Sequence, residues 1–143
     1  VIFGKNNIIH IKNFTDKFKN FQYNENMNFE NITYGIIGLG LMGGTIAKSI
    51  RKNVLSENQC AKIIALDKNK ESLENAFSEK IIDSYFFPEE TKKMLEQCDV
   101  VFICLYPHAT LDFLLENKKN FKSGSIITDI SGVKGIFEKL QKA

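Results

Sequence analysis

The sequence predicts an α/β fold of the Rossmann type, a doubly wound and mostly parallel sheet with helices on both faces. From Thr33 onward, short apolar runs of strand length alternate with stretches of helical period, and the links between them are short. A glycine-rich turn, Gly38–Gly43, follows the first predicted strand, and Asp67 ends the second. In a fold of this kind, ligands bind at the carboxyl ends of the strands.

The first two strands are short and apolar. Tyr34–Gly38 predicts a buried strand that runs into the glycine turn, and Lys62–Leu66 predicts a second strand that is closed by Asp67. A helix with one buried face is expected after each strand, because apolar residues recur there at helical spacing. These residues are Met42, Ile46, Ala47 and Ile50 in the first helix, and Leu73, Ala76 and Phe77 in the second.

The second half of the chain continues the alternation of predicted strands and helices. Ile81–Phe87 predicts a short third strand with its loop, and Pro88 with its following acids suits a helix start. Asp99–Leu105 is apolar after its first residue, as a strand covered on both faces should be, and Pro107 ends it. A helix (Leu111, Leu114, Leu115), a strand (Ser125–Asp129) and a final helix (Val133, Ile136, Phe137, Leu140) complete the series.

Length and composition indicate one ordinary globular domain. The chain has 143 residues, of which 43% are hydrophobic and 25% charged. We expect residues 31–143 to form the domain. Residues 1–30, rich in Asn, Lys and Phe and without clear period, are interpreted as an N-terminal extension that need not belong to it.

Several classes of protein are disfavoured. A net charge of +2, spread along the chain, leaves no basic stripe for nucleic acid. No apolar run is long enough to span a membrane, and charged residues interrupt the N-terminal segment, so we expect a cytoplasmic protein. The three cysteines form no CxxC pair, which disfavours a metal site and suggests reduced thiols.

The turn itself, Gly38-Leu39-Gly40-Leu41-Met42-Gly43, is a GxGxxG sequence placed between a predicted strand and a predicted helix. Gly38 permits the sharp turn, Gly40 lacks the Cβ that would block a pyrophosphate, and Gly43 lets the helix pack closely on the strand. The start of the helix offers free N–H groups and a partial positive charge to phosphates. The motif therefore predicts a dinucleotide site.

Asp67 is expected to accept both hydroxyls of an adenosine ribose. Its charge would repel a 2′-phosphate by about 4 kcal/mol per pair of unit charges at close range, which favours NAD over NADP. Lys68 and Lys70 lie nearby and would soften this preference. Two other interpretations remain open at this point. The glycines could form only a tight turn with Asp67 capping the next helix, or the site could bind S-adenosylmethionine, although the doubled Gly43-Gly44 fits dinucleotide packing better.

Two segments resemble the signatures of the prephenate dehydrogenase family. The first is the turn with its doubled glycine, Gly38 to Ala47, and the second is Thr128 to Gly135, which follows the last predicted strand. Together they indicate a resemblance over roughly residues 32–143 to the N-terminal nucleotide-binding domain. That family oxidises prephenate with NAD or NADP: hydride leaves the ring carbon bearing the hydroxyl, carbon dioxide is lost, and 4-hydroxyphenylpyruvate forms on the route to tyrosine.

The resemblance implies roles for particular residues. The turn would hold the pyrophosphate, Asp67 would hold the ribose, the segment after the Asp99–Leu105 strand would line the nicotinamide, and Asp129 to Lys134 would approach nicotinamide and substrate. The residues implied as cofactor-binding are Gly38, Gly40, Leu41, Met42, Gly43, Asp67, Leu105, Tyr106, Pro107, Thr110 and Asp129.

The catalytic residues are less well defined by the resemblance. The family often has Gly-Ser before Val-Lys, whereas this chain has Ser131-Gly132, and the family's catalytic histidine lies in a His-Pro motif downstream of the Lys134 position. That position would lie beyond Ala143 and would be followed by a helical domain through which the full-length protein would form a homodimer, so we expect this chain alone to be inactive. Ser131, Lys134 and His108 are the catalytic candidates within it.

Each candidate also has a plain interpretation. His108 could act as a general base near neutral pH, or it could simply begin a helix near the cofactor. Lys134 could attract a substrate carboxylate or only solvate a helix start. Prephenate and arogenate both remain open as substrates. A β-hydroxyacid dehydrogenase, a pyrroline-carboxylate reductase and a non-catalytic NAD-sensing module are the alternative functions, and the segment from Asp129 to Gly135 argues against the first two.

Overall fold

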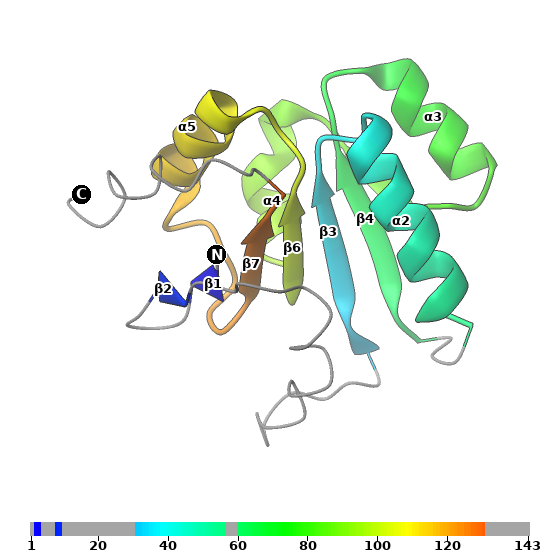
Figure 1. The fold of residues 1–143 in the computed structure, drawn as a ribbon, viewed down its shortest axis with the longest axis horizontal. Coiled ribbons are helices and arrows are strands. Elements are labelled where there is room, and N and C mark those ends of the chain that lie inside the picture. The colour runs from blue at the N-terminus through cyan, green and yellow to red at the C-terminus, as the bar shows by residue number, and fades with distance from the viewer. Residues whose placement is uncertain (1, 4–7, 10–30, 57–59, 131–143) are drawn as a thin grey trace.

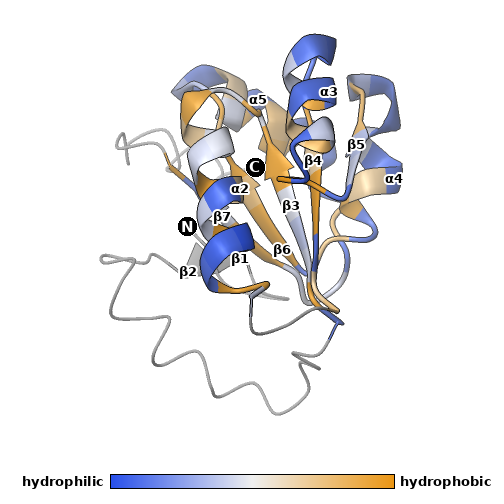
Figure 2. Ribbon diagram, turned by 90° about the vertical axis from the view of Figure 1, so that its right-hand side faces the viewer, coloured by the Kyte–Doolittle hydropathy of each residue, from blue (hydrophilic) through white to orange (hydrophobic). Residues whose placement is uncertain are grey.

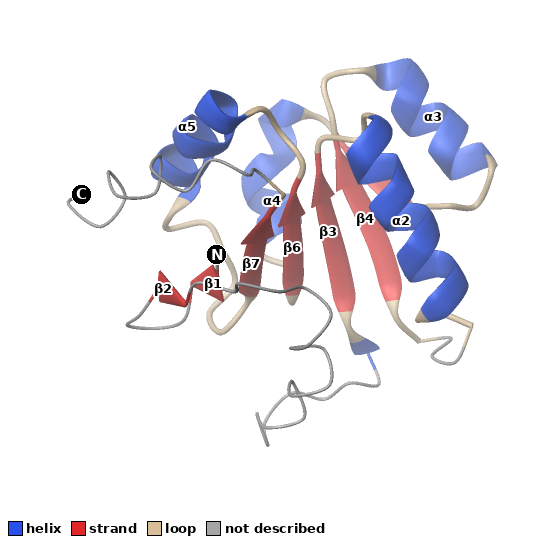
Figure 3. Ribbon diagram, viewed as in Figure 1, coloured by secondary structure: helices blue, strands red, loops and turns tan. Residues whose placement is uncertain are grey.

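A computed structural model gives the structure of the chain and describes residues 2–3, 8–9, 31–56 and 60–130. Its centre is a five-stranded sheet with the order β5-β4-β3-β6-β7, in which every pairing is parallel. The strands are β3 (Thr33–Ile37), β4 (Lys62–Leu66), β5 (Ser84–Phe86), β6 (Val100–Ile103) and β7 (Ile126–Asp129). The doubly wound parallel sheet predicted from the sequence is confirmed (Figures 1 and 3).

Helices connect the strands and cover both faces of the sheet. They are α2 (Leu41–Asn53), α3 (Lys70–Ser78), α4 (Thr91–Leu95) and α5 (Pro107–Asn117), with a 3₁₀ turn η3 (Pro88–Glu90) before α4. The chain runs outward from β3 through β4 to β5, then returns to pair β6 on the other side of β3. The reversal between β3 and β6 is the topological switch point, where ligands bind in open α/β sheets.

Alternate residues of each strand pack against opposite helix layers. In β3, Ile36 contacts the layer of α2 and α3, whereas Ile37 contacts the layer of α4 and α5. Figure 2 shows the resulting arrangement, in which largely hydrophobic strands lie between helices that carry both hydrophilic and hydrophobic residues. The helix residues buried against the sheet are Ala47, Ile50, Leu73 and Ala76 on one face, and Met94, Leu95 and Leu114 on the other.

Two residues expected in the apolar helix faces lie outside the core. Met42 is 54% exposed because it lies in the first turn of α2, above the end of the sheet. Phe77 is half exposed because it packs edge-on against Tyr85 at the border of the sheet, with the ring centroids 5.7 Å apart. The helical period was predicted correctly in both helices, but the predicted buried face of each helix is wider than the observed one.

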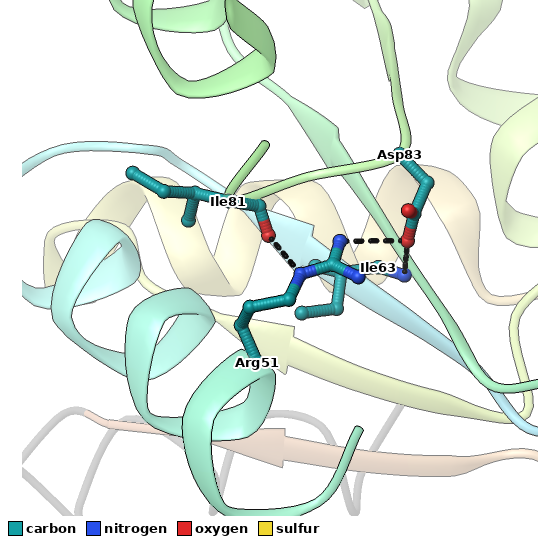
Figure 4. Close-up of polar contacts among 4 residues, drawn as sticks. All are labelled: Arg51, Ile63, Ile81 and Asp83. Atoms are coloured by element: carbon teal, nitrogen blue, oxygen red, sulfur yellow. Dashed lines mark hydrogen bonds and ion pairs between the residues drawn. The ribbon is translucent and has the colours of Figure 1, made fainter. Parts of the chain in front are cut away.

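Aspartates fix the strands at the opposite, amino edge of the sheet. Asp83, just before β5, accepts hydrogen bonds from the backbone N–H of Ile63 (2.7 Å) and from Arg51 Nη2 (2.8 Å), while Arg51 Nε donates to the Ile81 carbonyl (3.1 Å; Figure 4). Asp99, just before β6, likewise accepts from the N–H of Thr33 at 2.9 Å. These carboxylates satisfy backbone donors that begin β4 and β3.

Outside the main sheet, β1 (Ile2–Phe3) and β2 (Ile8–Ile9) form an antiparallel pair, and β1 lies close to β7. The interpretation of residues 1–30 as an extension stays a prediction. The final predicted helix, which would contain Lys134 in its first turn, lies outside the described residues, as does Ser131 before it. None of the helices in residues 31–56 and 60–130 combines the length and apolar character needed to cross a bilayer.

Candidate functional site

The glycine turn is built where β3 ends between its two neighbours. The N–H of Gly38 donates to the Leu66 carbonyl of β4 at 2.8 Å, and the N–H of Cys104 donates to the Ile37 carbonyl at 2.7 Å. The strand end is therefore held from both sides, and the turn leaves the sheet at a fixed position beside the switch point. Preorganisation of this kind favours ligand binding because little ordering remains to be done.

Gly38 and Gly43 are glycines for steric reasons. Gly38 has φ +88°, in the left-handed region, and a Cβ there would lie 2.9 Å from the Cys104 carbonyl oxygen. A Cβ on Gly43 would lie 1.9 Å from the carbonyl oxygen of Gly38, so α2 passes too close to the turn for any side chain. Both structural roles predicted for these residues are confirmed. Gly44 differs, because a Cβ there meets nothing within 4 Å, so the close packing depends on Gly43 alone.

Gly40 is glycine for a different reason. It is exposed, its φ of −71° is open to any residue, and a Cβ would meet nothing within 4 Å. Neither backbone strain nor packing within the described residues therefore requires a glycine at this position. The open space beside the backbone is what a bulky ligand that approaches the main chain needs.

The start of α2 is left open to an anion. Gly40 is its N-cap and supplies no side-chain hydrogen bond, and no acidic residue lies in the first turn. The N–H groups of Leu41, Met42 and Gly43 precede the first intrahelical donor position, so they carry the positive end of the helix dipole. In contrast, Asn69 caps α3 by accepting from the N–H of Ser72 at 3.2 Å. The N–H groups at the start of α2 are therefore not capped by a side chain, whereas the start of α3 is capped by Asn69.

Asp67 faces the glycine turn. Its Oδ2 accepts a hydrogen bond from the N–H of Leu39 at 2.5 Å, and its Oδ1 accepts from the N–H of Asn69 at 2.8 Å. The helix cap that the plain interpretation assigned to Asp67 belongs to Asn69. Each carboxylate oxygen keeps further acceptor capacity for a hydroxyl group. Leu39 and Asn69 were not among the expected site residues, because backbone donors carry no signal in side-chain identity.

The β6–α5 connection forms the other side of the switch point. Tyr106 is the N-cap of α5 without a side-chain cap, is 88% exposed, and is followed by Pro107 in the first turn. Leu105 is half-buried and packs on the core, and His108 is exposed on the first turn of the helix. With Leu41, 87% exposed at the start of α2, Tyr106 places apolar surface at the carboxyl edge of the sheet.

Thr110 differs from the other residues expected to line the cofactor. Its side chain is fully buried, and its hydroxyl donates to the Leu105 carbonyl at 3.3 Å. Its N–H also donates to the Tyr106 carbonyl at 2.8 Å. Any contribution of Thr110 to the site therefore passes through the shape of the turn that it stabilises.

Asp129 ends β7 at the same edge of the sheet. It lies opposite Ile103 in the parallel register and is half-buried, and the next residue, Ile130, donates its N–H to the Ile103 carbonyl at 3.3 Å. The carboxyl ends of β3, β4, β6 and β7 thus bring Gly38, Asp67, Leu105 and Asp129 to one side of the molecule. Ser131 and Lys134 follow Asp129 but lie outside the described residues.

Cys98 lies in the core and Cys104 packs against it, and neither thiol is reactive at neutral pH. Burial raises the pKa of Cys104 to about 12. Burial, and then the nearby Asp99 charge, raise the pKa of Cys98 to about 12. Both stay protonated at neutral pH, and a thiol rather than a thiolate is a poor nucleophile and metal ligand. Within the described part of the chain, no three His, Cys, Asp or Glu residues are grouped so that they could hold a metal ion.

Solved structures share this fold. The prephenate dehydrogenase from A. aeolicus, in complex with hydroxyphenyl propionate and NAD+, is 24% identical, with a TM-score of 0.67 over 78% of this chain and 37% of that chain. Synechocystis arogenate dehydrogenase is 19% identical, with a TM-score of 0.61 over 75% of this chain and 37% of that chain. Apo scyllo-inositol dehydrogenase from Lactobacillus casei is 24% identical, with a TM-score of 0.60 over 81% of this chain and 33% of that chain.

At these identities the likeness shows the fold, and the chain spans only 33% to 37% of the length of these three proteins. The comparison with curated proteins found no match. A family model matches residues 33–132, from the first strand of the sheet to just past the last, which is well over half of the chain. The chain therefore belongs to the family described as NADP oxidoreductase, coenzyme F420-dependent.

Proposed function

We propose that residues 31–143 are the dinucleotide-binding domain of a nicotinamide-dependent dehydrogenase. The observation that carries the proposal is the contact between the Asp67 carboxylate and the Leu39 N–H, because it brings a ribose-binding acid and the uncapped start of α2 to one site. A phosphate donor set and a diol acceptor side by side match the pyrophosphate and adenosine ribose of NAD(P). The open space at Gly40 accommodates the close approach of the pyrophosphate.

Each group of residues in the site would bind a different part of NAD(P). The N–H groups of Leu41, Met42 and Gly43 would bind the diphosphate, and Asp67 would bind the adenosine ribose. Leu105, Tyr106 and Pro107 would contact the nicotinamide end, with Thr110 holding their turn and Asp129 approaching from β7. When bound, NAD(P) accepts hydride from the substrate, and these residues bind and orient it.

For the substrate we propose prephenate, with arogenate as the alternative. The support is the pair of sequence signatures together with the fold shared with a prephenate and an arogenate dehydrogenase. The whole reaction would oxidise the hydroxyl-bearing ring carbon and release carbon dioxide, in a cytoplasmic homodimer. Among the residues of this chain, Ser131, Lys134 and His108 are the candidates for contact with the substrate.

Cofactor binding is tested by calorimetric titration of the chain with NAD, NADP and S-adenosylmethionine. We expect both dinucleotides to bind and S-adenosylmethionine not to bind. Gly40→Val is the diagnostic variant, because its side chain enters open space and leaves the fold intact while it blocks the diphosphate. An unchanged melting temperature with dinucleotide binding lost supports the proposal. Wild-type dinucleotide affinity in this variant would contradict it.

The substrate needs a separate experiment, since the resemblance implies a catalytic histidine outside this chain. In a hybrid, residues 31–143 replace the matching part of the A. aeolicus prephenate dehydrogenase, and NADH formation is followed with prephenate and with arogenate. Turnover of prephenate is expected, which would support a productive placement of the cofactor by residues 31–143. A hybrid that binds NAD but turns over neither compound would favour a non-catalytic NAD-sensing module.

A further inference from the structure

The main sheet has two outer strands, β5 and β7, and the surroundings of the two strands differ. After β5, the N–H of Phe87 donates to Glu90 Oε2 at 3.4 Å, and the carbonyl of Phe87 accepts from the N–H of Glu90 at 2.9 Å. Before β5, Asp83 donates its N–H to the Ile63 carbonyl at 2.7 Å. Both ends of this three-residue strand are therefore closed by local hydrogen bonds.

Strand β7 presents backbone groups on its outer side. The N–H of Ile126 donates to the Asp99 carbonyl at 2.8 Å, and the N–H of Ile130 donates to the Ile103 carbonyl at 3.3 Å. Since alternate residues of a parallel strand bond to the same neighbour, Ile127 turns its N–H and carbonyl away from β6. Its side chain is buried in the core, which fixes this orientation. An edge of this kind can pair with a strand of another chain, and proteins commonly cover it.

The antiparallel pair β1 and β2 lies at this edge. β1 is close to β7 on the side away from β6, and β2 lies beyond β1 (Figure 1). Each strand has two residues, and all four residues are apolar. A two-stranded hairpin is at best marginally stable alone in water, so one this short needs a partner surface. The outer side of β7 provides that surface.

We propose that the hairpin β1–β2 is an intramolecular cover for the edge of β7, so that this part of residues 1–30 belongs structurally to the domain. The hairpin keeps the outward N–H and carbonyl of Ile127 from pairing with another chain. A segment of the same chain suits this role, because its covalent link to β3 gives it a high effective concentration at the edge. The inference concerns the edge of the sheet and does not depend on which cofactor the domain binds.

Hydrogen exchange of assigned amides, measured by NMR on the full chain, tests the proposal. Phe3→Pro should disrupt the hairpin, because β1 lies between β2 and β7, where proline is poorly tolerated. Asn13→Pro is the matched control, since the same substitution falls outside β1 and β2. The Ile127 amide should exchange about tenfold faster in Phe3→Pro than in the wild type or the control. The Ile36 amide, in the central strand β3, should be unchanged in all three chains, which would show that the sheet stays folded.

Sedimentation velocity gives a second measurement. At rising concentration, Phe3→Pro should self-associate more than Asn13→Pro, because the edge of β7 is uncovered. Equal exchange rates of the Ile127 amide in all three chains would overturn the proposal, and so would equally faster exchange in both proline variants. If dilution of the wild type removes the protection of Ile127, the cover comes from a second copy of the chain, and the intramolecular assignment is wrong.

Discussion

The backbone N–H of Leu39 and the carboxylate of Asp67, which are 28 residues apart in the sequence, form a 2.5 Å hydrogen bond at the carboxyl edge of the sheet. The bond joins the end of β4 to the turn after β3. It also orients the acid towards the side where the start of α2 presents its free N–H groups. The carboxylate is therefore part of the architecture of the turn as well as the expected ribose ligand.

Asp67→Asn separates these two functions. The amide oxygen can still accept from Leu39, so the turn should persist, although the amide NH2 cannot accept the bond from Asn69, and the charge that repels a 2′-phosphate is removed. We expect NAD to bind more weakly, NADP to bind more tightly, and the ratio between them to change by about tenfold or more. Calorimetry on both dinucleotides measures this, with Asp112→Asn, an exposed carboxylate on α5, as the control. An equal change in the ratio of NADP to NAD affinity in both variants would contradict the role of Asp67 as the ribose ligand.

Gly43→Ala and Gly44→Ala form a matched pair on α2. The first places a Cβ 1.9 Å from the Gly38 carbonyl oxygen, whereas the second meets nothing within 4 Å. We expect Gly43→Ala to lower the free energy of unfolding by about 2 to 4 kcal/mol, because the helix must move away from the turn. Gly44→Ala should raise it by up to about 1 kcal/mol through better helix propensity. Urea unfolding followed by circular dichroism gives both values, and similar effects in the two variants would refute the packing argument.

The cluster around Asp83 predicts an order of effects on stability (Figure 4). Asp83→Ala leaves the Ile63 N–H without its carboxylate, which should cost about 1 to 3 kcal/mol. Arg51→Met removes a half-exposed ion pair and a bond to the Ile81 carbonyl but keeps the bond to Ile63, and should cost about 1 kcal/mol or less. Chemical denaturation of both variants tests this order, and the reverse order would show that the cation dominates.

The raised pKa values of Cys98, which is buried, and Cys104, which is half-buried, predict selective thiol chemistry and a stability that falls at alkaline pH. At pH 8, Cys98 and Cys104, each with a pKa of about 12, should react with a disulfide reagent only after unfolding, whereas the exposed Cys60 should react in the folded chain. Because folding raises these pKa values above the ordinary 9.0, the unfolded state loses protons first. Stability should therefore be complete below pH 9 and fall as the pH rises towards 12. Rapid reaction of all three thiols in the folded chain would contradict this.

Local patterns were sufficient to predict the elements and the turn. Strand length, helical period and the spacing of Gly38 and Gly43 depend on neighbouring residues, and the structure confirms them for the elements between Thr33 and Asp129, while the final predicted helix stays a prediction. Features that depend on contacts between distant parts of the chain could not be predicted from such local patterns. The exposure of Met42 follows from its height above the strand ends, and the burial of Thr110 follows from how the β6–α5 turn closes.

The site was predicted in outline for the same reason. Parallel strands end at one edge, so a glycine turn after one strand and an acid after the next had to lie near each other. Which donor meets the Asp67 carboxylate could not be inferred, because the Leu39 N–H is identical in kind to every other backbone donor. The alternative in which Asp67 only caps the next helix could not be excluded from the sequence, because Asp and Asn serve equally well as caps, and the structure gives the cap of α3 to Asn69.

The strand order also bears on how the chain acquires its structure during synthesis. The central strand β3 pairs with β4 on one side and with β6 on the other, where Tyr34 lies opposite Val100. No described pairing of this sheet joins strands through a hairpin, so each requires closure of a long loop, which slows folding. A growing chain on the ribosome would hold β3 with one edge unsatisfied until β6 emerges, and through that interval it would be a natural client for chaperones.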